Sequence, residues 1–156
     1  MFDSCTSLKS VNLPLMTRAS MGLFAFCSSL THITLPLLTT IESGTSMYHS
    51  MFRACGNLEY VDMPSLTAIG GHGLYWCSSL RTLILRNTEA VCSLAATTGI
   101  NADAVASGEF YIYVPAALYD SYVSGTNWTE FADLFRKLED YTVDGTTTGE
   151  LDETKI

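Results

Sequence analysis

Apolar residues recur along the chain in one pattern that returns several times. In the stretch CSSLTHITLP (27–36), a cysteine, a leucine, an isoleucine, a leucine and a proline stand at set offsets. Four cysteines begin copies of this pattern: Cys5, Cys27, Cys55 and Cys77. The residue three positions before each of them is Phe2, Phe24, Phe52 or Leu74. The pattern indicates a chain built from repeats of one structural unit.

Each repeat predicts one short strand that ends at a proline. Val11 and Leu13 alternate with polar residues, which is the period of a strand with one buried face. Pro14 follows directly and cannot donate a backbone hydrogen bond, so it ends the pairing. Ile41 and Ile69, five residues after their prolines, supply apolar groups for the opposite wall of the repeat. One repeat cannot bury these residues alone, so neighbouring repeats must stack into a solenoid.

The pattern weakens after Leu85, where Arg86 stands in place of proline. We expect an irregular crossover over 86–109, with a helix-like part at 91–96. FYIYVP (110–115) restores the pattern and predicts a fifth strand, so the solenoid spans 1–115. Near-helical spacing then predicts a C-terminal cap over 116–141, in which Trp128, Phe131 and Phe135 cover the last repeat. The acidic, Thr- and Gly-rich segment 142–156 is expected to be a mobile tail.

The repeats resemble a known family. MFRACGNLEYVDMPSLTAIG (51–70) and CSSLTHITLPLLTTI (27–41) are similar to the BspA-like leucine-rich repeats, F-x-x-C-x-x-L-x-x-I-x-L-P-x-x-x-x-x-I. The cysteines are 22, 28 and 22 residues apart, within the roughly 20 to 29 residue period of leucine-rich repeats. The stretch 110–135 resembles the segment that closes many such proteins from gut bacteria and their phages. The resemblance implies an α/β solenoid with a short parallel sheet of about five strands and a small helical cap.

The same resemblance implies a surface-exposed or secreted binding or adhesion module, without fixing its ligand. We therefore expect a non-enzymatic protein at the cell surface, outside the cell or on a virion. The net charge of −8 argues against nucleic acid, because phosphate binding needs clustered Lys and Arg. No long apolar run and no charged-then-apolar start occur, so neither membrane insertion nor a signal peptide is predicted within this sequence.

Residues between the apolar strand positions are expected to line one face of the sheet, the concave face of a solenoid. Hydroxyl, amide, carboxylate and tyrosine groups suit recognition of a protein or glycan on a host or cell surface by many modest contacts. A solvated strand face without a ligand is the alternative. The candidate residues are Asn12, His32, Thr34, Tyr60, Asp62, Thr82, Tyr111 and Tyr113, in rows completed by Ser10 and Ile84.

Catalytic and metal motifs are not found in the sequence. The three histidines, His32, His49 and His72, stand in unrelated contexts, and no nucleophile, base and orienting group can be assembled from the motifs present. The cysteines lack the paired spacing of zinc ligands. We therefore expect no catalysis, no metal and no cofactor, and we interpret the cysteines as small buried thiols.

Two further features leave alternatives open. The chain enters its first repeat at Phe2, so the first strand has an open edge. Either the repeats continue a longer array, or this edge is an interface for self-association or assembly, for example in a phage tail or surface array. Six extra residues between Cys27 and Cys55 predict a protruding loop containing Gly44, Ser46, Tyr48 and His49, which is either functional or a tolerated insertion.

Overall fold

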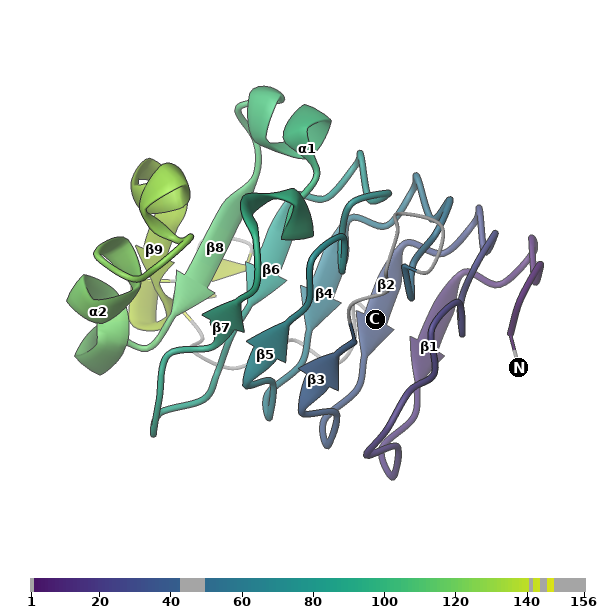
Figure 1. Cartoon of the computed structure of the whole chain (residues 1–156), viewed down its shortest axis with the longest axis horizontal. Coiled ribbons are helices and arrows are strands. Elements are labelled where there is room, and N and C mark those ends of the chain that lie inside the picture. The colour runs from purple at the N-terminus through teal and green to yellow at the C-terminus, as the bar shows by residue number, and fades with distance from the viewer. Residues whose placement is uncertain (1, 43–49, 141, 144–145, 148–156) are drawn as a thin grey trace.

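The protein is a solenoid whose coils stack side by side (Figure 1). The computed structural model describes residues 2–42, 50–140, 142–143 and 146–147. One parallel sheet of six strands runs along it in the order β1-β2-β4-β6-β8-β9. Its strands are β1 (Ser10–Asn12), β2 (His32–Thr34), β4 (Tyr60–Asp62), β6 (Thr82–Ile84), β8 (Tyr111–Val114) and β9 (Phe135–Lys137). The predicted fold class is thereby confirmed.

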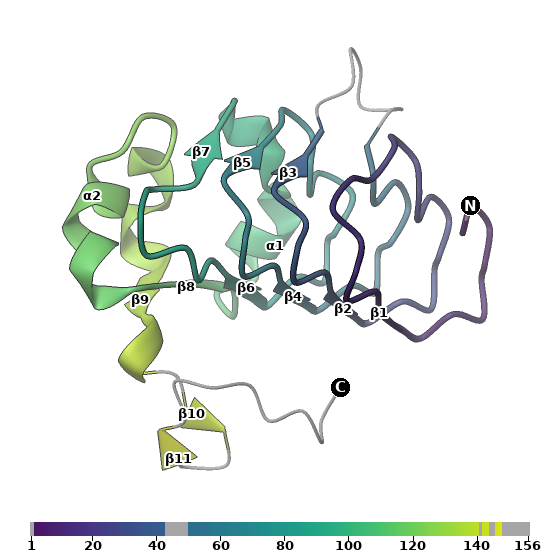
Figure 2. The ribbon, with the colours of Figure 1, turned by 90° about the horizontal axis from the view of Figure 1, so that it is seen from below.

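A second, smaller parallel sheet forms the opposite wall of the solenoid (Figure 2). It consists of β3 (Thr40–Ile41), β5 (Ala68–Ile69) and β7 (Ser93–Leu94). Ile41, Ile69 and Leu94 stand in register across it and are buried, and Ile41 and Ile69 are the isoleucines that follow the proline in each repeat. The apolar core lies between the two sheets.

The phenylalanine and the cysteine of each repeat join one coil to the next. The ring centroids of Phe2 and Phe24 are 5.4 Å apart, and those of Phe24 and Phe52 are 5.8 Å apart. Cys27 Sγ donates a hydrogen bond to the carbonyl oxygen of Phe2, and Cys55 Sγ donates to that of Phe24, each over 3.0 Å. In these two repeats, the spacing F-x-x-C thus places the thiol within hydrogen-bonding distance of the phenylalanine carbonyl oxygen of the preceding coil.

The environment of the cysteines matches the predicted buried thiols with one exception. Cys27, Cys55, Cys77 and Cys92 are buried and unbridged. Burial raises the pKa of Cys55 and of Cys92 to about 12, so both remain neutral thiols. Cys5 is exposed instead, which corrects the expectation for this residue. It lies in the first described coil, where no earlier coil covers it.

The crossover after β6 differs from the predicted helix at 91–96. Ser93–Leu94 forms strand β7, because Leu94 continues the buried column begun by Ile41 and Ile69. This tertiary pairing overrides the local sequence pattern. Helical turns come later, as the 3-10 helix η2 (Thr97–Gly99) and helix α1 (Ala102–Ala106).

The C-terminal segment combines short helices with a sixth strand. Its helical parts are η3 (Ala116–Leu118), α2 (Tyr119–Val123), η4 (Thr129–Leu134) and η5 (Leu138–Asp140). A helix was expected where β9 is found. Phe135 instead pairs in register with Ile112 and is buried, and β9 covers the edge of β8 that would otherwise be unpaired. The sheet therefore has six strands rather than five.

Trp128 joins the C-terminal segment to the solenoid by a hydrogen bond to the crossover after β6. Its Nε1 donates to the carbonyl oxygen of Cys92 over 2.6 Å, while the Tyr122 hydroxyl accepts a hydrogen bond from the Cys92 backbone N–H over 2.8 Å. Trp128, Phe131 and Phe135 are all buried, as the sequence predicted. Within the described ranges, no helix has the length and apolar character needed to span a bilayer.

Two predicted features fall largely outside the described residues. The loop with Gly44, Ser46, Tyr48 and His49 lies entirely outside them. Of the predicted tail, β10 (Thr142–Val143) and β11 (Thr146–Thr147) are described and pair antiparallel. The domain boundaries at 115 and 141 remain predictions.

The stacked core predicts that stability depends strongly on the leucines that recur at the same position of each repeat. Leu30 is completely buried. Its substitution by alanine should lower the free energy of unfolding by roughly 2–5 kcal/mol, measured by urea denaturation. Leu15 is 85% exposed, so Leu15→Ala should change the free energy of unfolding by less than about 0.5 kcal/mol. Equal effects of the two substitutions would contradict the assigned packing.

Candidate functional site

The six-stranded sheet brings all eight predicted site residues onto one face. Val11, Ile33, Val61, Leu83 and Ile112 point into the core, so the residues that flank them point the other way. We call this side the outer face. Strand register aligns it in two rows: Ser10, His32, Tyr60, Thr82 and Tyr111, and Asn12, Thr34, Asp62, Ile84 and Tyr113.

Aromatic contacts run between neighbouring strands of the outer face. The rings of His32 and Tyr60 stack at a centroid distance of 5.5 Å with 28° between their planes. His32 Nδ1 is also 2.9 Å from Thr31 Oγ1. At the other end, the Arg136 guanidinium lies 4.4 Å from the centroid of the Tyr111 ring. Cation–π contact of this kind orients both side chains.

Arg136 was not among the predicted site residues. It stands opposite Tyr113 because β9 continues the sheet beyond β8. Its guanidinium also donates to the carbonyl oxygens of Asp133 and Phe135, over 2.9 and 2.7 Å. The signal that could have identified it is the alternation of Phe135 with the exposed Arg136, which the helical interpretation of 116–141 concealed.

Asp62 lies at the centre of the outer face and is not available to a ligand. Its side chain is completely buried, and Arg86 Nε donates to its two carboxylate oxygens over 3.2 and 3.1 Å. Burial raises the pKa of Asp62 from 3.8 to about 6, although the Arg86 charge opposes this shift. Arg86 occupies the position of the repeat proline, so the break in the pattern supplies the countercharge for Asp62. The predicted ligand contact is corrected to a structural ion pair.

Exposure divides the outer face into a closed centre and two accessible ends. Thr34 and Tyr60 are each only 8% exposed, and Ile84 is buried. The Thr34 hydroxyl has no hydrogen-bond partner among the described residues. The more accessible candidates are Asn12 and His32 at one end, and Thr82, Tyr111 and Tyr113 at the other. Partial burial raises the pKa of Tyr113, so its hydroxyl stays protonated and can donate.

The histidines do not converge on a shared site in the part of the chain that is described. His32 faces Tyr60 on β4, whereas His72 lies in a turn, with its ring edge-on to Tyr75 at 5.3 Å. His49 lies outside the described residues. Across the described ranges, no three His, Cys, Asp or Glu side chains are grouped as a metal site.

Comparison with known proteins agrees with this architecture. A family described as BspA type leucine rich repeat region matches residues 1–95 in six copies. The matched region ends just after β7, so it contains every strand of the smaller sheet. A search of curated proteins gives no match to the chain.

The buried Asp62 predicts a specific pH dependence of stability. The pKa of Asp62 is higher in the folded than in the unfolded state. The contribution of Asp62 to the free energy of unfolding is therefore greatest at low pH and is lost as pH rises from about 4 to about 6. The difference in unfolding free energy between the native protein and Asp62→Asn should therefore fall by on the order of 2 kcal/mol over this interval, at about 1.4 kcal/mol per pKa unit.

Urea denaturation at several pH values measures this difference, and subtraction cancels the titration of the other carboxylates. If the difference instead increases with pH, Arg86 outweighs burial and the pKa of Asp62 is lowered.

Proposed function

Because this chain belongs to the BspA type leucine-rich repeat family, we propose that it is a binding or adhesion module of a bacterial surface protein. Repeats of this family are commonly surface-associated, bind proteins and are typically non-enzymatic. In the proposal, the ligand is a protein or a glycan on a host or cell surface. It binds at the C-terminal end of the outer face.

The observation that carries this proposal is the group formed by Tyr111, Tyr113 and Arg136. Both tyrosines are half-buried, and Arg136 is exposed beside them. Tyrosine and arginine are the side chains that most often dominate binding energy at protein interfaces. Here they stand on paired strands, β8 and β9, so little side-chain or backbone freedom is lost on binding. The ring faces and hydroxyl groups serve equally for peptide groups and for sugars.

The remainder of the outer face supports binding rather than catalysis. Asp62, the one carboxylate of the two rows, is held by Arg86. His32 is stacked on Tyr60 and contacts Thr31. The Asp62 carboxylate is engaged by Arg86 rather than by the His32–Thr31 pair, so no nucleophile, base and orienting group are assembled there among the described residues. In the proposal, the accessible groups act through shape and hydrogen bonding.

A second candidate function is assembly through the β1 edge, in a surface array or phage tail. Apolar side chains of the first coil are less buried than their equivalents in the second. Phe2, Leu8 and Leu13 are half-buried, whereas Phe24, Leu30 and Leu35 are fully buried. β1 also ends the sheet and presents backbone groups for pairing with another strand. Both features fit a docking surface for a further coil.

Binding through the C-terminal end predicts a marked effect of Tyr111→Ala. A panel of immobilised glycans and purified host-surface proteins is first screened for a ligand. Tyr111→Ala should then weaken binding by about ten- to thirtyfold, as expected for a central aromatic contact. Tyr119→Ala, the same change at a half-buried tyrosine of α2 that belongs to neither row of the outer face, should leave affinity within about twofold. Full affinity in a folded Tyr111→Ala protein would refute the assignment.

Assembly through β1 predicts self-association or binding to other repeats. Light scattering over a concentration series measures the solution mass of the chain. An oligomer that dissociates in Leu13→Lys, but persists in Tyr111→Ala, would support docking at the first coil. A monomer at all concentrations favours the binding module.

A further inference from the structure

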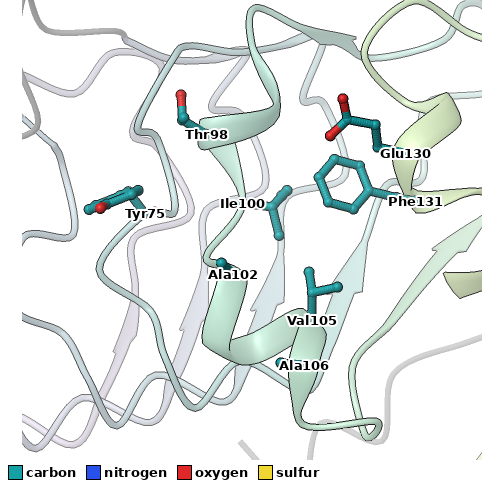
Figure 3. A pocket seen from close by; sticks show the side chains of 8 residues that line it. All are labelled: Tyr75, Thr98, Ile100, Ala102, Val105, Ala106, Glu130 and Phe131. Carbon is teal, nitrogen blue, oxygen red and sulfur yellow. The ribbon is translucent and has the colours of Figure 1, made fainter.

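A cavity of about 370 Å³ opens between α1 and η4, away from the outer face (Figure 3). Tyr75 stands at one side of it and Phe131 at the other, with Ile100 and Val105 between them. None of the outer-face residues lines it. Its size is at the lower end of the range of about 300–1,000 Å³ for ligand pockets.

The walls of this cavity are held in place by hydrogen bonds. Asn101 Oδ1 accepts from the backbone N–H groups of Asp103 and Ala104 over 2.8 and 3.2 Å, which caps α1. Asn101 Nδ2 donates to the carbonyl oxygen of Tyr75 and so ties the aromatic wall to the helix. On the far wall, the buried Phe131 packs against Trp128 at a ring centroid distance of 6.2 Å. The cavity is therefore preformed.

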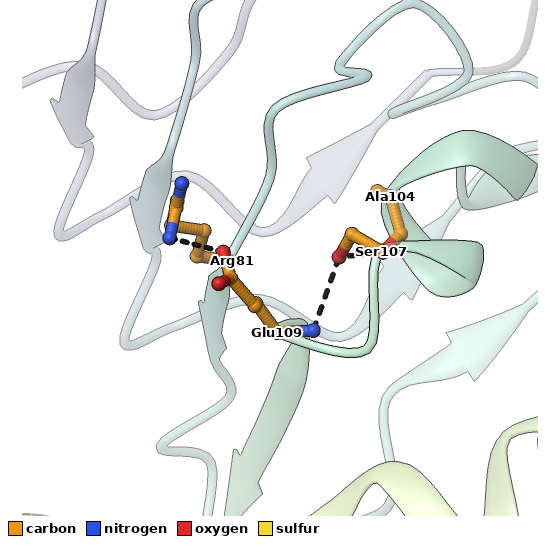
Figure 4. Close-up of polar contacts among 4 residues, drawn as sticks. All are labelled: Arg81, Ala104, Ser107 and Glu109. Atoms are coloured by element: carbon orange, nitrogen blue, oxygen red, sulfur yellow. Dashed lines mark hydrogen bonds and ion pairs between the residues drawn. The ribbon is translucent and has the colours of Figure 1, made fainter.

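The other end of α1 is fixed too (Figure 4). Ser107 Oγ donates to the Ala104 carbonyl oxygen over 2.7 Å and accepts from the Glu109 N–H over 3.1 Å. The Glu109 carboxylate forms an ion pair with Arg81. Arg81 is thus paired with the carboxylate of Glu109, which follows α1, and this ion pair helps to hold the C-terminal end of α1 in place.

Glu130 is the one charged residue that lines the cavity. Its side chain is exposed and lies beside the Phe131 ring (Figure 3). It has no ion-pair partner among the described residues. An apolar floor with one carboxylate at its rim is complementary to a cation on an apolar stem. The net charge of −8 further favours a cationic partner.

We propose that this cavity receives a lysine side chain presented by a partner polypeptide. The unbranched lysine stem packs on Ile100 and Val105, and the ammonium group meets Glu130 beside the Phe131 ring. Arginine fits less well, because a single carboxylate leaves several of its five N–H donors without acceptors above apolar walls. This site is independent of the outer face and of its proposed ligand.

A polypeptide is a better source of the ammonium group than a free amine. The cavity is open, and one exposed ion pair contributes little. A free amine would lose its translational freedom for that contact alone. A lysine held by a partner that already contacts the protein elsewhere has a high effective concentration at the cavity.

The test titrates the chain with acetyl-Gly-Lys-Gly-amide and follows backbone amide signals by NMR at low salt. The matched peptide contains norleucine, which has the same stem without the ammonium group. The lysine peptide should give saturable shifts at Ile100, Val105 and Phe131, and the norleucine peptide should bind more weakly. Glu130→Gln should weaken lysine binding by about two- to fivefold, the range of an exposed ion pair. Asp133→Asn, an exposed carboxylate on the same η4, should have no effect.

A second variant tests the cavity itself. Ala106→Phe places a ring in the cavity from α1 and should abolish binding, while its amide spectrum reports whether the fold is kept. If this variant does not fold, the comparison of lysine-peptide binding by Glu130→Gln and Asp133→Asn tests the proposal instead. The proposal is overturned by the absence of saturable shifts, by equal binding of the two peptides, or by equal effects of the two carboxylate substitutions. Butylammonium carries the ammonium group without a polypeptide and should bind no more tightly than the lysine peptide; tighter binding of butylammonium would overturn the polypeptide source.

Discussion

Each coil of this protein buries its apolar side chains against its neighbours, and every other feature of the structure depends on that shared burial. Phe24 is completely buried because Phe2 and Phe52 lie on either side of it. The same dependence explains why the cysteine is part of the repeat. Its thiol is small enough to fit between coils and donates to a carbonyl oxygen of the preceding coil, so packing and hydrogen bonding join the same two units.

Beyond β8 the regular repeat gives way to short helices and one further strand, which specific contacts hold to the solenoid. β9 pairs with β8, and Trp128 and Tyr122 both bind the backbone of Cys92 in the preceding crossover. These contacts close the core while leaving Arg136 exposed beside Tyr111. The same closure places η4 opposite α1 and so creates the cavity that contains Glu130. Both proposed sites therefore lie where the regular repeat gives way to the helical segment that follows β8.

The outer face shows that a periodic sheet need not be uniformly accessible. In the middle of the array, Asp62 and Arg86 form a buried ion pair, and Tyr60 is almost completely covered. Breaking such a pair is costly, because the remaining charge would lose its partner in a place that water does not reach. Asp62 and Arg86 are thus engaged with each other, and the accessible side chains of the outer face lie toward its two ends, with Tyr111, Tyr113 and Arg136 on β8 and β9.

The repeat spacing by itself determined the solenoid, the strand positions, the buried columns and the face on which the site residues lie. It could do so because period-two alternation and a terminal proline act locally, and because stacking requires every coil to repeat them. Tertiary structure alone decided what depends on contacts between coils. Ser93–Leu94 became a strand rather than a helix because Leu94 has Ile69 beside it. Phe135–Lys137 became a strand because β8 offered an unpaired edge. Asp62 is buried with a countercharge because Arg86, 24 residues later in the chain, donates hydrogen bonds to its carboxylate. Pairing partners and burial of this kind are set by distance in space, which spacing along the chain does not encode.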